Sequence, residues 1–463
     1  MASPRIVVVG AGPAGVRAAE ALVQAGIRPV VIDEGRRDGG QIYRRQPESF
    51  RRSYAALYGT EAARAQHLHR TFDELRQSVD YRADTLVWGV SEQRLHLASG
   101  MQTETLDFDA LIIASGATDR LMPVKGWNLA GTYSLGGAQI ALKAQACAIG
   151  QRVIFMGTGP LLYLVAAQYR KAGAGVAAVL DTSPFQLRVK ALPKLLARPG
   201  VLAKGLALTW ALKRTGVAMH AGITPLAIEG GAEGGVKGVR FRTRDGTTHS
   251  TPCDAVALGY HLRPETQLAD LARCGFRFDE ETRQFFPVKD EDGRSSVAGI
   301  YLAGDGSLPL GADGAELAGR LAAFAALADL SLPVPQGELQ KLRRALNAME
   351  RFRRGLAAAF PWPAHLAAAL CDDTVICRCE TITAGALRDT VREKGGVEVN
   401  RAKAFSRVGM GRCQGRYCGH AAAEVIAAAA GLPVQEVGRL RGQAPVKPLP
   451  IDVRAQGDRH EAL

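Results

Sequence analysis

The sequence predicts an α/β fold with two Rossmann-like dinucleotide-binding domains, the second inserted in the first, and a small, mainly helical C-terminal domain. The first two are indicated by a strand, a Gly-rich turn, a helix and a second strand, an order that recurs about 150 residues later. The last is indicated by four cysteines in two close pairs after residue 370. A chain of 463 residues is long enough to bury more than one core.

The first of these units starts almost at the N-terminus. The apolar run 5–10 predicts a strand, about fifteen residues with helical apolar spacing follow, and the run 29–32 predicts the second strand. The second unit repeats this order, with strands expected at 152–156 and 176–180 and a helix between them that reaches about Ala172. Both units have the form of a dinucleotide-binding fold.

Later apolar runs place the domain boundaries. Residues 111–116 predict a buried strand that ends in a Gly turn, and the runs 255–259 and 299–303 repeat this pattern. Residues 332–337 contain two prolines and a glycine and predict a linker, after which apolar residues three or four apart predict a helix. We expect residues 1–120 and 251–335 to form the first domain, 121–250 the inserted domain, 336–370 a helical linker, 371–440 the cysteine-bearing domain and 441–463 a loose tail.

The chain is basic, with a formal net charge of +13 and a pI near 9.5. Its basic residues are dispersed and the sequence contains no nucleic-acid-binding module, so we expect no nucleic-acid partner. A basic surface suits an acidic protein partner, an anionic lipid or an anionic substrate, and a merely solvated Arg-rich surface is an equally good interpretation.

The sequence also bears on location. No apolar run reaches the roughly 18 to 20 residues that cross a bilayer, so we expect no transmembrane segment. The N-terminus enters an apolar strand at once, which leaves no room for a secretion signal. Eight cysteines without such a signal indicate a reducing compartment. We expect a cytoplasmic protein, with peripheral contact at the inner membrane as an option.

The first Gly-rich turn, at residues 9–15, reads Val-Gly-Ala-Gly-Pro-Ala-Gly. Gly10 permits the tight turn, Gly12 lets backbone amides approach a pyrophosphate, and Gly15 lets the helix pack close to the sheet. The N-terminus of that helix would then meet the negative phosphates. The turn therefore predicts a bound dinucleotide.

An acid ends the second strand of this unit. Asp33 lies eighteen residues past Gly15 and suits a hydrogen bond to an adenosine ribose, with Glu34 as the neighbouring alternative. Arg36 and Arg37 follow closely and could instead bind a 2′-phosphate. The identity of the nucleotide therefore depends on other residues.

Two further segments identify that nucleotide by resemblance. Residues 39–44 read Gly-Gly-Gln-Ile-Tyr-Arg, and residues 300–306 read Ile-Tyr-Leu-Ala-Gly-Asp-Gly. With the glycine turn, these resemble the flavoproteins with two dinucleotide-binding domains, in which a late strand ending in Gly-Asp places a carboxylate on the ribityl chain of the flavin. The resemblance covers about residues 1–330 and implies FAD in the first domain; the alternative is a Rossmann fold that has lost its ligand. The contacts that it implies are Gly10, Gly12, Pro13, Ala14, Gly15, Asp33, Glu34, Gly40, Gln41, Arg44, Gly116, Gly304 and Asp305.

The second Gly-rich turn is degenerate. Residues 157–162 read Gly-Thr-Gly-Pro-Leu-Leu, so Leu162 stands where a third glycine would let the helix approach the sheet, and Asp181 ends the next strand. This packing disfavours NAD(P) and leaves a structural role or another nucleotide as the leading interpretation. No C-x-x-C or C-x-x-x-x-C pair precedes residue 370, so we expect no thioredoxin-reductase-like activity.

Four cysteines distinguish the C-terminal domain. Cys377 and Cys379 form a C-x-C pair, and Cys413 and Cys418 form a C-x-x-x-x-C pair after 33 intervening residues. Two close pairs can supply four thiolates to one metal centre, and the neighbouring glycines leave backbone N–H groups available to the sulfurs. A zinc ribbon usually has C-x-x-C pairs, so we expect a 2Fe-2S cluster and keep zinc as the alternative.

The cysteine module resembles the ferredoxin-like domain of the bacterioferritin-associated type, whose later pair is usually C-x-x-C. Three segments, Gly-Gly-Gln-Ile-Tyr-Arg at 39–44, Gly-Pro-Leu-Leu at 159–162 and Cys-Gln-Gly-Arg-Tyr-Cys-Gly at 413–419, narrow the resemblance further. Over nearly its whole length the chain resembles the α (A) subunits of heteromeric opine oxidases and D-hydroxyproline or proline dehydrogenases. The hydrogen cyanide synthase B subunit is a related protein.

This resemblance implies an electron-transfer subunit without a catalytic residue of its own. A separate FAD-containing, amino-acid-oxidase-like β subunit would oxidise the substrate, and this chain would relay electrons through flavin and 2Fe-2S to an acceptor. Further options are an FMN at a subunit interface and a small γ subunit. The rival hypothesis is a self-contained NAD(P)H:acceptor oxidoreductase, and a third is a regulatory or iron-storage-linked module without flavin.

Basic residues also gather around the later cysteine pair, with no acid between them. They are Arg401, Lys403, Arg407, Arg412 and Arg416. They predict a docking patch for an acidic partner, and a solvated face is the alternative.

Overall fold

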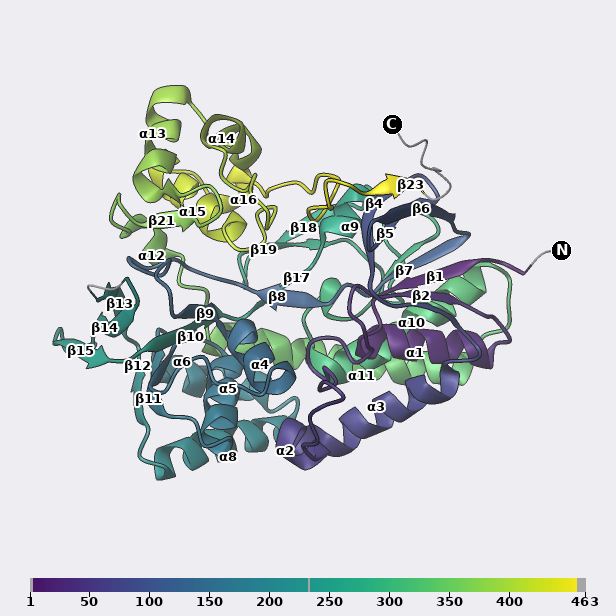
Figure 1. The fold of residues 1–463 in the computed structure, drawn as a ribbon, viewed down its shortest axis with the longest axis horizontal. Helices are drawn as coiled ribbons and strands as arrows, with labels where there is room; N and C mark the ends of the chain where they lie inside the picture. Colours follow the sequence, from purple (N-terminus) through teal and green to yellow (C-terminus); the bar gives the residue numbers. More distant parts are fainter. Residues whose placement is uncertain (1–2, 232–233, 456–463) are drawn as a thin grey trace.

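The computed structural model describes residues 3–231 and 234–455 of the chain (Figure 1). Its first domain has a parallel five-stranded sheet in the order β20-β7-β1-β2-β3. These strands are β1 (Ile6–Val9), β2 (Val30–Ile32), β3 (Asp80–Arg82), β7 (Ala110–Ile113) and β20 (Ile300–Leu302). Because β20 joins β7 from nearly 200 residues away, this domain is discontinuous in the sequence. The predicted α/β class with Rossmann-like sheets is confirmed.

Both faces of this sheet are covered, which explains why β1 is apolar at every position. Ile6 and Val8 pack with the helices α1 (Pro13–Gln24), α3 (Ala62–Leu75) and α10 (Gly311–Asp329), next to the short α2 (Tyr54–Tyr58). Val7 and Val9 point to the other face and pack with an antiparallel sheet. That sheet consists of β4 (Thr85–Ser91), β5 (Arg94–Ser99) and β6 (Gln102–Asp107).

The second domain has its own parallel sheet, in the order β12-β11-β10-β16-β9. The strands are β9 (Thr132–Ser134), β10 (Val153–Thr158), β11 (Val176–Asp181), β12 (Ala218–Ala221) and β16 (Ala255–Tyr260). One face packs against α4 (Leu135–Ala144), α5 (Pro160–Lys171) and α8 (Pro199–Arg214). An antiparallel sheet of β13 (Thr224–Gly230), β14 (Val236–Arg242) and β15 (Thr248–Pro252) lies beside it.

The domain boundary that we expected at residue 251 is wrong. The run that was expected to rejoin the first domain is β16, which lies between β10 and β9 in the second sheet. All six of its residues are buried, and a central strand of either sheet would show the same apolar run. The chain leaves the first domain through β8 (Ala117–Asp119) and returns through β17 (Leu262–Pro264), and these two strands pair antiparallel.

The helix α11 (Gln336–Ala359) spans the two domains. Leu342 packs in the core of the first domain, whereas Phe352 and Ala359 pack with Leu195 of the second. Its apolar stripe therefore faces its own protein. No helix in the ranges 3–231 and 234–455 has both the length and the hydropathy to span a membrane.

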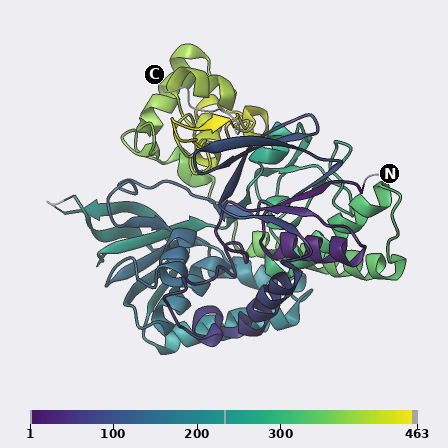
Figure 2. The same ribbon diagram turned by 45° about the vertical axis from the view of Figure 1, so that its right-hand side comes forward.

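The C-terminal domain is small and mainly helical, and it lies against both other domains (Figures 1 and 2). Its elements are α12 (His365–Ala368), β21 (Val375–Cys377), β22 (Ile382–Thr383), α13 (Ala384–Lys394), α14 (Val399–Ser406), α15 (Gly419–Ala430) and α16 (Val434–Val437). Ile376 and Val425 share one apolar core with Trp127 and Tyr260 of the second domain. The cysteines thus belong to a small domain that packs onto the two dinucleotide-binding-type domains.

The expected loose tail is ordered as far as residue 455. Val446 is buried in the first domain, and its N–H donates to the carbonyl of Trp88 at 3.0 Å. Further on, β23 (Arg454–Ala455) pairs parallel with β6 (Figure 1). Three prolines, at residues 445, 448 and 450, interrupt the segment, so its sequence did not reveal this contact. Residues 456–463 lie outside the described part of the chain.

Candidate flavin and iron-sulfur sites

The Gly-rich turn between β1 and α1 has a geometry that only glycine permits. Gly10 has a φ of +105°, and a Cβ there would lie 2.4 Å from the carbonyl oxygen of Ala114. A Cβ at Gly15 would lie 1.7 Å from the carbonyl oxygen of Gly10, so the helix approaches the strand only because residue 15 has no side chain. Gly12 is the N-cap of α1, at the positive end of the helix dipole.

A cavity of about 1230 Å³ opens at this turn. It exceeds the roughly 300–1,000 Å³ of most small-molecule sites and suits a ligand of dinucleotide size. The predicted contacts that line it are Gly10, Gly12, Pro13, Ala14, Asp33, Glu34, Gly40, Gln41, Arg44, Gly116 and Asp305. Gly15 and Gly304 do not line the cavity, but each packs directly against a residue that does. Gly304 has a φ of +64°, and a Cβ there would lie 2.8 Å from Ala14.

The two acids at the end of β2 have different roles. Asp33 accepts hydrogen bonds from the N–H groups of Ala11 and Gly35, both at 2.6 Å, and thereby fixes the turn. Burial raises the pKa of its carboxyl. Glu34 is exposed and pairs with Lys447 of the C-terminal segment. Asp33 therefore lines the cavity and fixes its glycine turn, while Glu34 offers an exposed carboxylate at the edge of the cavity.

Asp305 begins the segment that leads into α10. One carboxylate oxygen accepts hydrogen bonds from the N–H groups of Leu310 at 2.8 Å and Gly311 at 3.0 Å. Burial raises the pKa of this carboxyl to about 6, although both N–H groups oppose that change. This is the acid that the flavoprotein resemblance places near the ribityl chain.

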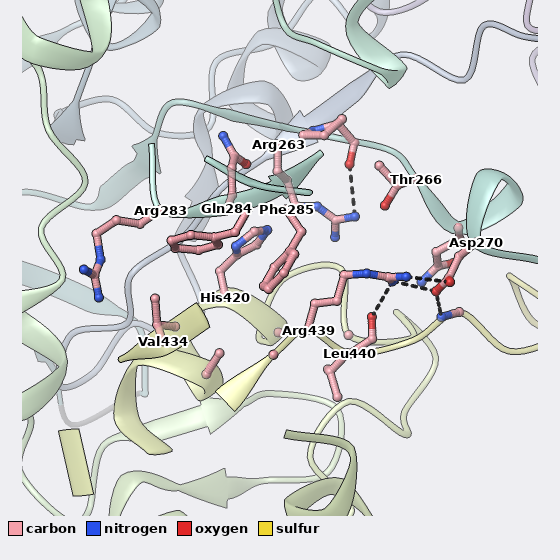
Figure 3. Close-up of a pocket in the computed structure, with 18 of the residues that line it drawn as sticks. Arg263, Thr266, Asp270, Arg283, Gln284, Phe285, His420, Val434, Arg439 and Leu440 are labelled. Atoms are coloured by element: carbon pink, nitrogen blue, oxygen red, sulfur yellow. Dashed lines mark hydrogen bonds and ion pairs between the residues drawn. The ribbon is translucent and has the colours of Figure 1, made fainter. Parts of the chain in front are cut away.

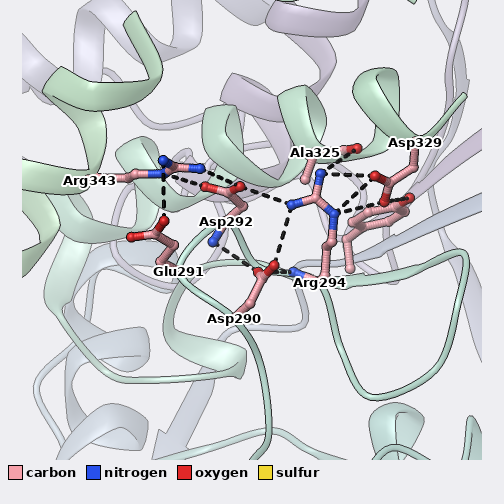
Figure 4. Close-up of polar contacts among 8 residues, drawn as sticks. Asp290, Glu291, Asp292, Arg294, Ala325, Asp329 and Arg343 are labelled. Atoms are coloured by element: carbon pink, nitrogen blue, oxygen red, sulfur yellow. Dashed lines mark hydrogen bonds and ion pairs between the residues drawn. The ribbon is translucent and has the colours of Figure 1, made fainter. Parts of the chain in front are cut away.

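A network of ion pairs holds the loop before β20, the strand that precedes Asp305 (Figure 4). Arg294 donates to Asp329 of α10 through Nε at 2.9 Å and to Asp292 through Nη1 at 2.9 Å. Arg343 of α11 donates to both oxygens of Asp292 at 2.7 Å. The loop before β20 is thus tied to the helices α10 and α11 by residues that do not themselves line the cavity.

The sequence reasoning missed Lys143, which also lines the cavity. The residue is 5% exposed, and its ammonium donates to the carbonyl of Ile42 at 3.0 Å. Burial lowers the pKa of this amine to about 8. The available signal was a single charged residue on the mostly apolar helix α4.

The four cysteines come together at one end of the C-terminal domain. Cys377 ends β21, Cys379 follows it, and the later pair lies in the loop that runs into α15. Hydrogen-bonding contacts join the Cys418 thiol to those of Cys377 and Cys413, and Cys413 to Cys379. Gly411 makes this approach possible, because a Cβ there would lie 2.2 Å from the Cβ of Cys379.

The surroundings favour the thiolate at Cys377 and Cys413, whereas burial raises the pKa of Cys379 and hydrogen bonds with Cys377 and Cys413 raise that of Cys418. Hydrogen bonds from Cys418 and from the backbone at residues 379, 380 and 409 lower the pKa of the Cys377 thiol to about 6. Similar bonds lower the pKa of the Cys413 thiol to about 5. Within residues 3–231 and 234–455, no three His, Cys, Asp or Glu side chains are arranged to hold a single metal ion. Four converging thiols with backbone donors are nevertheless the donor set that an iron-sulfur cluster uses.

Comparison with known families agrees with both sites. The pyridine nucleotide-disulphide oxidoreductase family matches residues 4–325, most of the chain. The chain belongs to this family. A second family, the BFD-like [2Fe-2S] binding domain, matches residues 375–428, which include all four cysteines. This member of the family is therefore an FAD-dependent oxidoreductase with a domain of the 2Fe-2S-binding type.

Curated relatives match the oxidoreductase over its whole length. The opine oxidase A protein of Rhizobium meliloti, one chain of that enzyme, is 38% identical, over 97% of this chain and 87% of the relative. The HcnB chain of hydrogen cyanide synthase from Pseudomonas aeruginosa is 31% identical, over 96% of this chain and 97% of the relative. The chain thus belongs with the opine oxidase A subunits and HcnB, as predicted.

Solved structures share the fold of this oxidoreductase. L-proline dehydrogenase from P. horikoshii superposes with a TM-score of 0.71 at 18% identity, covering 98% of this chain and 80% of that one. Thioredoxin reductase from T. acidophilum gives a TM-score of 0.53 at 20% identity, covering 71% of this chain and 99% of that one. These likenesses concern the fold alone.

The second Gly-rich turn of the oxidoreductase is closed by its own side chains. Asp181, fully buried at the end of β11, accepts hydrogen bonds from Thr158 at 2.7 Å, Tyr163 at 2.8 Å and Arg188 at 2.7 Å. A Cβ at Gly159 would lie 3.1 Å from the ring of His261. An acid at this position would bind the ribose in a working site, and here its oxygens are already engaged.

The predicted basic patch around the later cysteines is only partly a surface. Arg416 is largely buried and pairs with Glu265, and Lys403 is buried with its ammonium 2.8 Å from Gln443 Oε1. Arg407 pairs with Glu380 at 2.8 Å. The spacing in the sequence could not reveal these partners, which lie up to 151 residues away. Two of the five predicted basic residues, Arg407 and Arg416, are therefore neutralised by acids, and a third, Lys403, is buried.

Proposed function

We propose that this chain is the electron-transfer subunit of a heteromeric dehydrogenase or oxidase that acts on CH–NH donors, such as an opine, D-hydroxyproline or proline-like amino acid. The observation that carries the proposal is the union, in one chain, of a dinucleotide cavity and four converging thiols. Whole-length similarity to the opine oxidase A protein supports the substrate class.

The chain's own residues would hold both cofactors. Gly10, Gly12, Gly15 and the N-terminus of α1 would receive the pyrophosphate of FAD, and Asp305 would face its ribityl chain. Cys377, Cys379, Cys413 and Cys418 would bind the 2Fe-2S cluster. When bound, FAD exchanges electrons in pairs or singly, and 2Fe-2S exchanges them one at a time. Zinc is the competing metal, and an additional FMN at a subunit interface stays a prediction.

The second Gly-rich turn favours this relay over an NAD(P)H:acceptor reductase. The ribose-binding position, Asp181, is occupied by hydrogen bonds from Thr158, Tyr163 and Arg188. A nicotinamide cofactor would have to break this buried network, and breaking buried hydrogen bonds and ion pairs costs far more free energy than breaking exposed ones. The electrons would therefore enter from a partner rather than from NAD(P)H.

The partner that we propose is an FAD-containing, amino-acid-oxidase-like β subunit, with a third component, a small γ subunit. Both relatives are single chains of larger enzymes, opine oxidase and hydrogen cyanide synthase, which supports an assembly of several subunits. The sequence and its similarities offer no support for a nucleic-acid partner.

We further propose that the protein is cytoplasmic and makes peripheral contact with the inner membrane. The support is an exposed face on α6 (Phe185–Lys190), α7 (Leu192–Leu195) and α8. Phe185, Leu206 and Trp210 are each at least 60% exposed there, amid basic residues, with no acid from residue 182 to residue 228. Apolar and basic side chains together suit an anionic lipid surface.

Rapid mixing with NADH or NADPH separates the two candidate functions. The flavin of the purified subunit should not bleach with either nucleotide. After co-expression with an amino-acid-oxidase-like β subunit encoded by a neighbouring gene, the flavin should bleach when an amino acid is added. Rapid bleaching by a nicotinamide cofactor would instead establish the reductase. A fully reconstituted protein without flavin absorbance would favour the regulatory module.

A further inference from the structure

We infer that the four residues between Cys413 and Cys418 form a bridge that seats the cluster-binding loop on the rim of the flavin cavity. The bridge is defined as residues 414–417, Gln-Gly-Arg-Tyr. Its role in electron exchange rests on the function proposed above, whereas its contacts do not. Glu265 and Arg416 are then positioning residues.

The central contact of the bridge is an ion pair between Arg416 and Glu265. Nε of Arg416 lies 2.7 Å from one carboxylate oxygen of Glu265, and Nη2 lies 3.3 Å from the other. The two side chains are 10% and 17% exposed, so the pair is shielded from solvent. A two-pronged contact of this kind fixes orientation as well as distance.

Glu265 belongs to the wall of the flavin cavity. Its N–H donates to the carbonyl of Gly116 at 2.9 Å, and its carbonyl accepts from the hydroxyl of Ser115 at 2.6 Å. Ser115 and Gly116 follow β7 and line the cavity, as Glu265 and Arg416 do. One ion pair and these two hydrogen bonds therefore connect the cluster-binding loop to the cavity rim.

Further contacts join the bridge to the neighbouring domain. Gln267 donates from Nε2 to the carbonyl of Gln414 at 2.8 Å, and Arg263 of β17 donates to the carbonyl of Arg416 at 2.9 Å. Tyr417 lines the flavin cavity and hydrogen-bonds Thr118 of β8. Three of the four bridge residues thus contact the strand pair β8–β17 or the turn just after it.

These contacts give a physical reason for the unusual cysteine spacing. A C-x-x-C loop has only two residues between its ligands, so it could not make the three separate contacts that Gln414, Arg416 and Tyr417 make here. Arg416 also donates to the carbonyls of Val446 at 2.7 Å and Cys413 at 3.4 Å, so one side chain braces its own loop and the C-terminal segment. The two additional residues reach the neighbouring domain.

Other ion pairs join the same domains but lie away from the cysteines. Arg439 donates to both oxygens of Asp270 at 2.7 Å, beside a cavity of about 80 Å³ (Figure 3). Arg283 pairs with Glu424 of α15 at 2.9 and 2.7 Å. These pairs secure the domain interface, and the second supplies a matched control, because it is also bidentate but does not contact the loop.

Hydrogen–deuterium exchange on the full-length protein tests the bridge without any turnover. Glu265→Gln and Arg416→Gln should each speed the exchange of amides 414–419 by about tenfold, because a shielded ion pair is lost. The double variant should exchange no faster than either single variant, since the two residues act as one pair. Arg283→Gln should leave these amides unchanged.

Electron transfer is the second readout. Two electrons that leave the flavin site must pass singly, each reducing the cluster once before the acceptor reoxidises it. After photochemical reduction of the flavin, Glu265→Gln should slow bleaching of the cluster by about tenfold when samples of equal flavin and iron content are compared. Arg283→Gln should bleach at the unaltered rate.

The outcomes separate this inference from the proposed function. The bridge would be overturned if the glutamine variants exchange amide hydrogens and transfer electrons to the cluster at the same rates as Arg283→Gln, even with both cofactors present. A protein without cluster or flavin would overturn the proposed function, while the exchange result would still decide the contacts. If neither glutamine variant folds, Gln267→Met, which removes only the bond to Gln414, should speed exchange of the same amides. No change there would count against the bridge.

Discussion

The carboxylate of Asp33 accepts a hydrogen bond from the N–H of Ala11 at 2.6 Å, which ties the end of β2 to the Gly-rich turn. A second bond from Gly35 engages its other oxygen. Asp33 therefore acts on the cavity through the backbone, while Glu34 beside it remains exposed.

Replacing Asp33 should accordingly damage the turn as well as the flavin site. We expect Asp33→Ala to lower the free energy of unfolding by about 1–3 kcal/mol, because two backbone donors lose their partner. Thermal unfolding and the flavin-to-protein ratio measure this. Glu34→Gln, the control, should lower flavin affinity alone. An Asp33→Ala protein as stable as the parent would contradict this role.

Asp305 should make the stability of the flavin-free protein depend on pH. Its pKa is raised from 3.8 to about 6, so between these values the folded state holds more protons than the unfolded state. The free energy of unfolding should therefore fall as the pH rises through this window, by about 3 kcal/mol at most.

The isosteric variant Asp305→Asn tests this, since its side-chain oxygen can still accept from Leu310 and Gly311. Denaturant titrations from pH 4 to 7 should show a flatter profile and a more stable protein at pH 7. The same slope in both proteins would assign the titration to another group.

Lys143 should have the opposite dependence. Its pKa is lowered from 10.5 to about 8, so the unfolded state holds more protons in between, and stability should rise with pH across that range. Lys143→Met should remove up to about 3 kcal/mol of this rise and stabilise the flavin-free protein at neutral pH. Lys213→Met, an exposed position, is the control and should change neither quantity.

The four cysteines should act as one set. Serine at any of positions 377, 379, 413 or 418 should remove most of the iron of an anaerobically purified protein and the visible absorbance that exceeds the flavin bands, because each thiolate is a ligand in the proposed site. Flavin content should stay unchanged. Cys147→Ser, at an exposed free cysteine, should keep the cluster. Stoichiometric zinc in place of iron would show that the site is a zinc site.

Local motifs made the glycine turn and the cysteine pairs predictable. Gly15 is set by a contact with Gly10 inside one strand–turn–helix, so the sequence pattern carries its reason, whereas the contact of Gly10 with Ala114 comes from a distant strand. The run at β16 was misplaced, because a fully buried strand looks the same in either parallel sheet. The fold class followed from periodicity, and the exact exit and return of the inserted domain did not.

Long-range partners could not be predicted. Arg416 belongs to a basic cluster in the sequence, but Glu265, its partner, lies 151 residues earlier. Val446 is one of several apolar residues in a proline-rich segment, and only the folded first domain explains why it is buried. Nothing in the spacing of either residue marks such a contact.

The C-terminal segment has a consequence for biosynthesis. Val446 and Lys447 line the flavin cavity whose Gly-rich turn begins at Gly10, more than 400 residues earlier. On the ribosome, one wall of that cavity is missing until this segment has emerged. Flavin loading should therefore be completed only after translation, and a nascent chain stalled before residue 446 should hold FAD loosely.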